Sequence, residues 1–175
     1  FRPGVGPRRR SRAQGSGRSH FDTSGTLGRY VMDHIFRVGI WGNIPGMEEY
    51  IEYGRRPGGI YVPRFRNIGK DDGVGFKRGY GYQGGASRQP SRPVGFGASM
   101  KEGMRRYSGW QFHMGAFGEC LPYEDNKVSL HPDKVDRFGI PLMRFNVTFR
   151  DNELRMMADA RKEGEEMLRA AGLQN

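Results

Sequence analysis

Six stretches of the chain have the alternation of apolar and polar residues, or the β-branched and aromatic content, that is typical of β-strands. They cover residues 31–41, 60–66, 75–83, 110–121, 127–131 and 141–149. The turn at 122–126 between two of them is short, and short connections favour antiparallel pairing. The pattern therefore predicts an α+β fold, in which a mostly antiparallel sheet of about six strands has two or three helices packed over one face.

Two further segments have helical periodicity, while the Ser-, Arg-, Pro- and Gly-rich segment 84–93 predicts a loop. In 96–107, apolar residues recur at helical spacing. In the second segment Asp151 is a good N-cap, Glu153 lies in the first turn, where the helix dipole favours a negative charge, and Gly172 is a plausible stop. The expected apolar face of this helix contains Leu154, Met157, Gly164, Leu168 and Ala171.

Composition and charge divide the chain into two parts. The formal net charge is +10, but residues 1–20 contain six of the Arg residues and no acidic residue, so the remainder is only mildly basic. Residues 1–23 have too little apolar content to form a core, and we predict a disordered or non-native basic tail there. Residues 24–175 can form one domain. No apolar run approaches the ~20 residues of a membrane span, so we expect a soluble protein, cytoplasmic or periplasmic, with the compartment undetermined.

Three patterns that could indicate chemistry favour structural roles. The single cysteine, Cys120, has no Cys or His at ligand spacing, which leaves a metal site without support and favours burial in a strand. Residues 79–84 match G-x-G-x-x-G, but a dinucleotide fingerprint requires a helix directly after it, and 85–90 cannot open one. We therefore expect a glycine-rich strand whose backbone is closely approached. His131, at a strand end before Pro132, is expected to be structural.

Two histidines remain as candidate functional residues. On a strand, His113 shares a face with Gln111 and Gly115, and Phe117 and Glu119 continue that face. Such a polar face is unusual for a dry core and could line a substrate pocket. A hydrogen-bonded structural histidine explains the same pattern.

The second histidine, His34, follows Asp33, and the side chains of such neighbours point to opposite faces of a strand. They are poorly placed to share one proton or one metal ion. A structural turn and a ligand-contacting segment are both open interpretations.

Two motifs in this chain resemble the glucose–methanol–choline (GMC) family of FAD-dependent oxidoreductases. One is Asp-Arg-Phe-Gly-Ile-Pro at 136–141, followed by a strand and by Asp-Asn-Glu at 151–153 opening a helix. The other is 24–34, Ser-Gly-Thr-Leu-Gly-Arg-Tyr-Val-Met-Asp-His, which resembles the family's V-G-R-N-L-x-D-H segment with Tyr30 where the family has Asn. The two motifs bracket 24–172, and their order and separation match the family's substrate domain and the start of its C-terminal segment.

The resemblance implies a function, and it implies which parts of the intact protein bind the reactants and which perform the catalysis. The intact protein would oxidise the CH–OH group of a small-molecule alcohol, sugar or polyol with FAD as cofactor, and the sheet of this domain would roof the flavin. The resemblance places Gly28, Asp33 and His34 near the cofactor, and we assign Gln111 and His113 to substrate binding. The family's catalytic residues are expected beyond Asn175, in the remainder of the flavoprotein chain, so we assign no catalytic residue here. Because the chain begins with Phe1, we expect an internal piece that is inactive alone.

Two other classes of function are weighed against this one. An Arg-rich arm, with aromatic residues interleaved among basic ones at 61–66 and 76–82, could belong to a single-stranded nucleic-acid-binding module. Half-buried strands with a charged outer face explain the same interleaving, and we do not expect nucleic acid as the partner. A non-catalytic interaction domain is the third possibility.

Overall fold

The structure is a computed structural model that describes residues 22–55, 59–90 and 93–174. Six strands and two helices follow one another along these residues. They are β1 (His34–Asn43), β2 (Ile60–Val62), β3 (Tyr80–Pro90), α1 (Ala98–Met104), β4 (Tyr107–Glu119), β5 (Lys127–Val135), β6 (Pro141–Asn146) and α2 (Asp151–Ala170). Except for its last two residues, the tail predicted over 1–23 lies outside the described residues.

The strands form two antiparallel sheets. Four of them pair in the order β1-β4-β3-β2, and β5 pairs with β6 as a separate hairpin. The predicted α+β class and the antiparallel pairing are confirmed, but the six strands are divided between two sheets. The division arises because β4 ends at Glu119 and the turn at 122–126 leads the chain away from the sheet before β5 begins.

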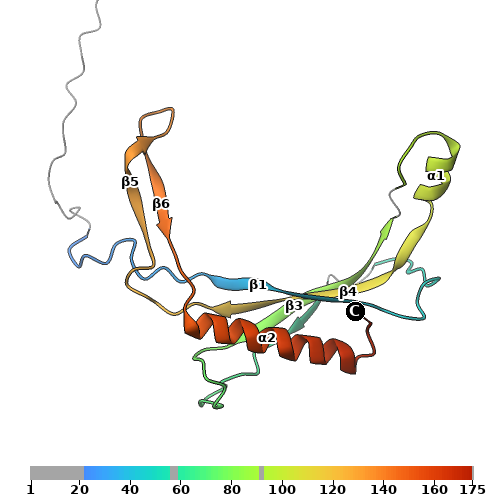
Figure 1. Cartoon of the computed structure of the whole chain (residues 1–175), viewed down its shortest axis with the longest axis horizontal. Coiled ribbons are helices and arrows are strands. Elements are labelled where there is room, and N and C mark those ends of the chain that lie inside the picture. The colour runs from blue at the N-terminus through green and yellow to red at the C-terminus, as the bar shows by residue number, and fades with distance from the viewer. Residues whose placement is uncertain (1–21, 56–58, 91–92, 175) are drawn as a thin grey trace, which may run out of the picture.

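The two sides of the four-stranded sheet differ in what covers them. Helix α2 lies along one side, and the β5–β6 hairpin and the segment carrying α1 extend from opposite ends toward the other side (Figure 1). Every residue of β6 is exposed, and α1 contains no buried residue. The only helix that packs on the sheet within the described residues is therefore α2, whereas the sequence predicted that two or three would do so.

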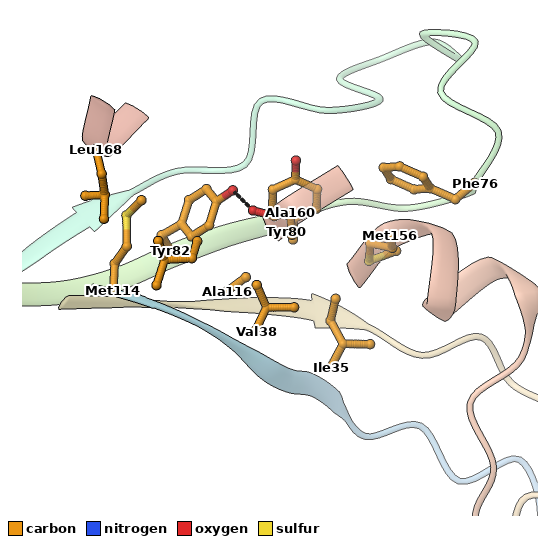
Figure 2. Packing of buried hydrophobic residues seen from close by; sticks show 11 residues of the cluster. Ile35, Val38, Phe76, Tyr80, Tyr82, Met114, Ala116, Met156, Ala160 and Leu168 are labelled. Atoms are coloured by element: carbon orange, nitrogen blue, oxygen red, sulfur yellow. Dashed lines mark hydrogen bonds between the residues drawn. The ribbon is translucent and has the colours of Figure 1, made fainter. Parts of the chain in front are cut away.

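The core lies between α2 and the side of the sheet that faces it (Figure 2). From the sheet come Ile35, Val38, Ile40, Tyr80, Tyr82, Met114 and Ala116, and from the helix Met156, Ala160 and Leu168. The Tyr82 hydroxyl donates a 2.6 Å hydrogen bond to the Ala160 carbonyl in this core, and burial raises the pKa of Tyr82 to about 12. The aromatic residues at 80 and 82 therefore belong to the core, which weakens the idea that they form a stacking platform.

An irregularity in β1 determines which of its side chains reach the core. The register with β4 shifts between Ile35 and Val38, so both residues point toward α2 although they are three positions apart. A β-bulge has this effect because it inserts one extra residue into the alternation. Consequently His34 and Gly39, the outer neighbours of the bulge, face the side of the sheet that α2 does not cover.

Two glycines allow α2 to approach the sheet closely. A Cβ atom on Gly164 would lie 1.9 Å from Ile40 Cδ1, and one on Gly118 would lie 2.6 Å from Met156 Sδ. Gly164 lies in the interior of a helix, where glycine costs about 0.5–1 kcal/mol relative to alanine. The close packing accounts for its presence in α2.

Replacing Gly164 by valine should destabilise the domain by about 1–3 kcal/mol, the usual cost of inserting atoms into a filled core. The matched control is Ala158→Val, on the exposed side of the same helix, which should change stability by only about 0.5 kcal/mol or less. Chemical denaturation followed by circular dichroism measures both values. Equal effects of the two substitutions would contradict the packing described here.

Several local predictions were wrong. Residues 84–90, predicted as a loop, continue β3 to Pro90, because pairing with β4 overrides their turn-like composition. Leu154, placed on the apolar face of the C-terminal helix, has 54% of its surface exposed. The buried residues of α2 are Glu153, Met156, Ala160, Gly164 and Leu168. The helix is thus rotated so that a carboxylate, rather than a leucine, enters the interior.

Two predicted strands have other bounds in the structure. The strand predicted at 60–66 ends at Val62, before Pro63, and the strand predicted at 75–83 begins only at Tyr80. The stop predicted at Gly172 is confirmed, because this residue, with a φ of 78°, follows the C-terminus of α2. Within the described residues, no helix has the length and apolar character needed to cross a membrane.

Candidate functional site

The side of the sheet opposite α2 is an uncovered surface, which we call the open face. Strand β4 runs through its middle and directs alternate side chains to it: Gln111, His113, Gly115, Phe117 and Glu119. The predicted alternation is confirmed, because Met114, Ala116 and Gly118 are buried on the other side. His113 is exposed, so it is not the histidine of a dry core.

Aromatic side chains from neighbouring strands lie on the same face. Trp41 is the β1 partner of His113 and has 57% of its surface exposed. Tyr61 of β2 is 65% exposed and Phe117 of β4 is 39% exposed. Exposed aromatic residues on a folded sheet are typical of surfaces that contact a ligand or another part of a protein.

Between these aromatic residues the open face has a floor without side chains. Gly39 of β1 and Gly115 of β4 are direct cross-strand partners at its centre. A Cβ on Gly39 would have nothing within 4 Å, and one on Gly115 would make only ordinary contacts of 3.7 and 3.8 Å. Neither residue has a positive φ. The fold therefore does not require glycine at either position, although glycine weakens a strand.

A hollow of about 280 Å³ occupies the end of the open face where β1 begins. The polar residues that line it are His34, Arg64, Gln83 and Glu119, and Tyr61 and Phe117 supply aromatic walls. His34 is the cross-strand partner of Glu119, and its ring meets the Phe117 ring edge to face at 6.2 Å between centroids. Planar polar groups beside aromatic rings can hydrogen-bond and stack on a polar ligand.

The charged groups of this hollow already have partners. Arg64 donates to the carbonyls of Arg66 and Asn67, at 2.9 and 2.6 Å. Glu119 lies 3.5 Å from Arg78, and both side chains are more than half exposed. An exposed pair of this kind contributes little to stability, so Glu119 is available to exchange its partner for a ligand.

The residues predicted to contact substrate lie at the other end of the open face. Gln111 donates from its amide nitrogen to the Asn43 side chain at 3.1 Å, and His113 lies between Trp41 and Gly85 across the strands. His113 lies six positions along β4 from Glu119, the partner of His34, which is a distance of about 20 Å. The two histidines thus share one face but are too far apart to act on the same atom.

Gly28 and Asp33 have structural contacts outside this hollow. The Gly28 carbonyl accepts a hydrogen bond from the Val128 N–H, and a Cβ on Gly28 would lie 2.3 Å from the Val128 carbonyl oxygen. The Asp33 carboxylate accepts from the His34 N–H, and its carbonyl accepts from the Cys120 N–H. Their assignment to cofactor binding, like that of His34, stays a prediction.

Sequence reasoning missed Tyr61, Arg64 and Gln83 as members of the site. They come from β2, the loop after it and β3, and only the register Tyr61–Gln83 brings them beside β4. The alternation of β3 was visible in the sequence, but the order of the strands was not.

The structural interpretations of two other candidates, Cys120 and residues 79–84, are supported. Cys120 is buried and free, and burial raises the pKa of its thiol, so it is a poor nucleophile. Within the described residues, no three His, Cys, Asp or Glu side chains gather as a metal site would need. Residues 79–84 run into β3 rather than a helix, and a Cβ on Gly84 would lie 2.1 Å from the His113 carbonyl oxygen.

Most of the aromatic residues between 61 and 82 lie in or against the core, whereas Tyr61 and the basic residues other than Arg66 are exposed. Phe65 packs against Tyr80 and Tyr82, and Arg66 bonds Asp159 and Glu163 at 2.9 and 2.7 Å. A stacking platform for nucleic-acid bases needs exposed rings. These contacts argue against such a platform here, while the Arg-rich arm lies outside the described residues.

Comparison with known protein families finds no family model that matches the chain. A search of curated proteins finds a 2-methyl-1,2-propanediol dehydrogenase from Mycolicibacterium austroafricanum, which is 30% identical over 143 residues. The alignment covers 76% of this chain and 25% of the dehydrogenase. The chain thus spans about a quarter of the length of this relative.

Proposed function

We propose that this chain forms the substrate-domain part of a GMC-type, FAD-dependent oxidoreductase that acts on the CH–OH group of a small alcohol, sugar or polyol. The distant relative is named as a dehydrogenase of a diol, which supports an alcohol oxidoreductase in general. The two motifs of the chain that resemble the GMC family supply the more specific part of the proposal. The coenzyme-binding and proton-transfer residues would come from the rest of the flavoprotein.

The observation that carries the proposal is the open face with Gly39 and Gly115 at its centre. These cross-strand partners lack side chains where the fold would accept them, between the exposed rings of Trp41 and Phe117. A flat, uncovered floor beside aromatic rings suits a planar ring system or a substrate held against one. The flatness of the open face and the missing Cβ atoms at its centre therefore support a role in covering the flavin ring.

The residues of this chain would position and enclose the reactants. When bound, FAD supplies a hydride acceptor for the C–H bond of the alcohol. In this proposal Gln111 and His113 hydrogen-bond the substrate hydroxyls at one end of the open face, and His34 lies beside the cofactor at the other. The spacing of about 20 Å between the histidines leaves room for both ligands along one face. The aromatic rings exclude water, which strengthens the remaining polar contacts.

The proposal predicts that flavin binding requires more than these 175 residues. The full-length gene product, purified with FAD, should retain flavin and oxidise a vicinal diol in the presence of an artificial electron acceptor. The 175-residue chain alone should retain little flavin and show no turnover. Visible absorbance of the flavin and acceptor reduction measure the two properties. Stoichiometric flavin with turnover in the short chain, or a flavin-free full-length product, would refute the proposal.

A further inference from the structure

The loop between β2 and β3 forms a second, basic hollow that the proposed oxidoreductase function does not use. This loop, residues 63–79, lies on the α2 side of the sheet (Figure 1). The Lys77 N–H donates to the Asn152 side chain at 2.7 Å, which attaches the loop to the start of α2. The hollow is therefore distinct from the open face, although Arg64 borders both.

The loop is held in one conformation by its own polar groups. The Asn67 side-chain amide donates to the carbonyls of Phe76 and Arg78, at 2.9 and 2.8 Å. Asn67 and Asp72 exchange two further bonds, from each backbone N–H to the other's side chain. These bonds fix the loop backbone from which the lining side chains extend, and a binding site requires such a rigid support.

Two residues of the loop adopt an unfavourable backbone conformation. Asn67 has a φ of 51° and Arg78 a φ of 70°. Asparagine tolerates this region, but arginine does so rarely, and its cost is of order 1–3 kcal/mol. Arg78 borders the hollow together with Arg64, and its guanidinium also lies 3.5 Å from the Glu119 carboxylate of the open face.

The hollow has a volume of about 430 Å³ and a positive lining. Its lining contains Arg64, Lys70, Lys77 and Arg78, and Asp71 contributes the single carboxylate. Arg64 donates to two backbone carbonyls and Arg78 pairs with Glu119, so the two lysines are the cations that a ligand would meet first. Asp71 accepts a bond from the Gly73 N–H at 2.8 Å. Among the residues that the structure describes, neither Lys70 nor Lys77 is in an ion pair. Arg155 of α2 lies against the loop at Gly75 and adds positive charge nearby.

From this geometry we propose that the loop is a binding site for the phosphate group of a small molecule. A concave surface with guanidinium and ammonium groups matches a phosphate dianion, which accepts several charge-assisted hydrogen bonds. The inward-facing aromatic residues beside the hollow favour a small phosphate ester over a nucleic-acid strand, which would need exposed rings for its bases. The proposal does not depend on the oxidoreductase function.

Pyrophosphate is a suitable probe, with the ¹⁵N-labelled 175-residue chain and amide shifts as the readout. Pyrophosphate should shift the amides of 67–78, and those of the open face should not move. The double variant Lys70→Gln/Lys77→Gln should weaken binding about tenfold or more, because each lost charge removes a charge-assisted bond. The matched control, Lys101→Gln/Lys134→Gln, removes two exposed charges elsewhere and should leave the dissociation constant unchanged.

Two results would overturn the proposal. Equal weakening in both double variants would mean that only overall charge attracts the anion. Tighter binding of a single-stranded oligonucleotide at the same amides would mean that the loop is part of a nucleic-acid surface. Selective weakening in the Lys70/Lys77 variant, with shifts confined to the loop, supports the phosphate site.

Discussion

The double substitution Gly39→Val/Gly115→Val should leave the domain folded but reduce the oxidation rate of the full-length gene product at least a hundredfold. Both positions accept a Cβ atom without clash, and valine favours a strand more than glycine does. The free energy of unfolding should therefore be unchanged or slightly higher. Two branched side chains would nevertheless fill the floor of the open face. Displacing bound reactants by about 1 Å is enough to cost about a hundredfold in rate.

A matched control separates an effect on the open face from a general effect of valine. Ser129→Val places the same side chain at an exposed position of the β5–β6 hairpin and should leave the rate unchanged. Flavin absorbance of each variant shows whether cofactor or substrate has been displaced. If the double variant keeps its full rate while both valines are in place, the open face has no part in the reaction.

Local patterns predicted those features of the site that depend on one strand. The alternation in 110–121 placed Gln111 and His113 on one face with Gly115, and the structure confirms that this face is shared. The same reasoning predicted β5, β6 and α2 to within a few residues at most boundaries. These elements were predictable because side-chain periodicity alone defines a strand or a helix.

Features that depend on pairing between distant residues could not be predicted in this way. The hollow beside His34 requires the register His34–Glu119 and the register Tyr61–Gln83, which join four segments of the chain. The bulge at 36–37, which turns His34 and Gly39 to the same face, also has no signal in the sequence. Residues 84–90 form a strand only because β4 accepts their backbone hydrogen bonds.

The rotation of α2 depends on a similar long-range contact, centred on Glu153. This side chain is fully buried, and its carboxylate accepts bonds from the N–H groups of Leu121 and Arg150, at 3.0 and 2.9 Å. The Tyr123 hydroxyl donates to it at 3.1 Å and the Asn152 amide at 3.1 Å. Glu153 thus ties the start of α2 to the turn that follows β4, and this turn leads to the hairpin.

Burial and hydrogen bonding have opposite effects on the pKa of Glu153. Burial alone would raise it, but the bonds from the two backbone N–H groups, Asn152 and Tyr123 together lower it below the ordinary value. A carboxyl group with a depressed pKa in the folded state stabilises the fold above its unfolded pKa of about 4.3. That stabilisation is lost as the pH falls through the lower, folded pKa. Burial raises the pKa of Tyr123 to about 12, and the hydrogen bond of its hydroxyl to the Glu153 carboxylate is the second cause.

Replacing Glu153 by alanine should destabilise the domain by about 3–5 kcal/mol, because it leaves several buried donors without an acceptor. Glu153→Gln keeps one carbonyl acceptor, so its free energy of unfolding should fall by less. Because glutamine does not titrate, the stability of this variant should also fall less steeply as the pH is lowered. Glu165→Ala, at an exposed position of the same helix, is the control and should change stability by about 0.5 kcal/mol or less. Denaturation at a series of pH values measures all three variants. If Glu153→Gln loses stability in acid as steeply as the unmodified chain, then another carboxylate must hold the turn to the helix.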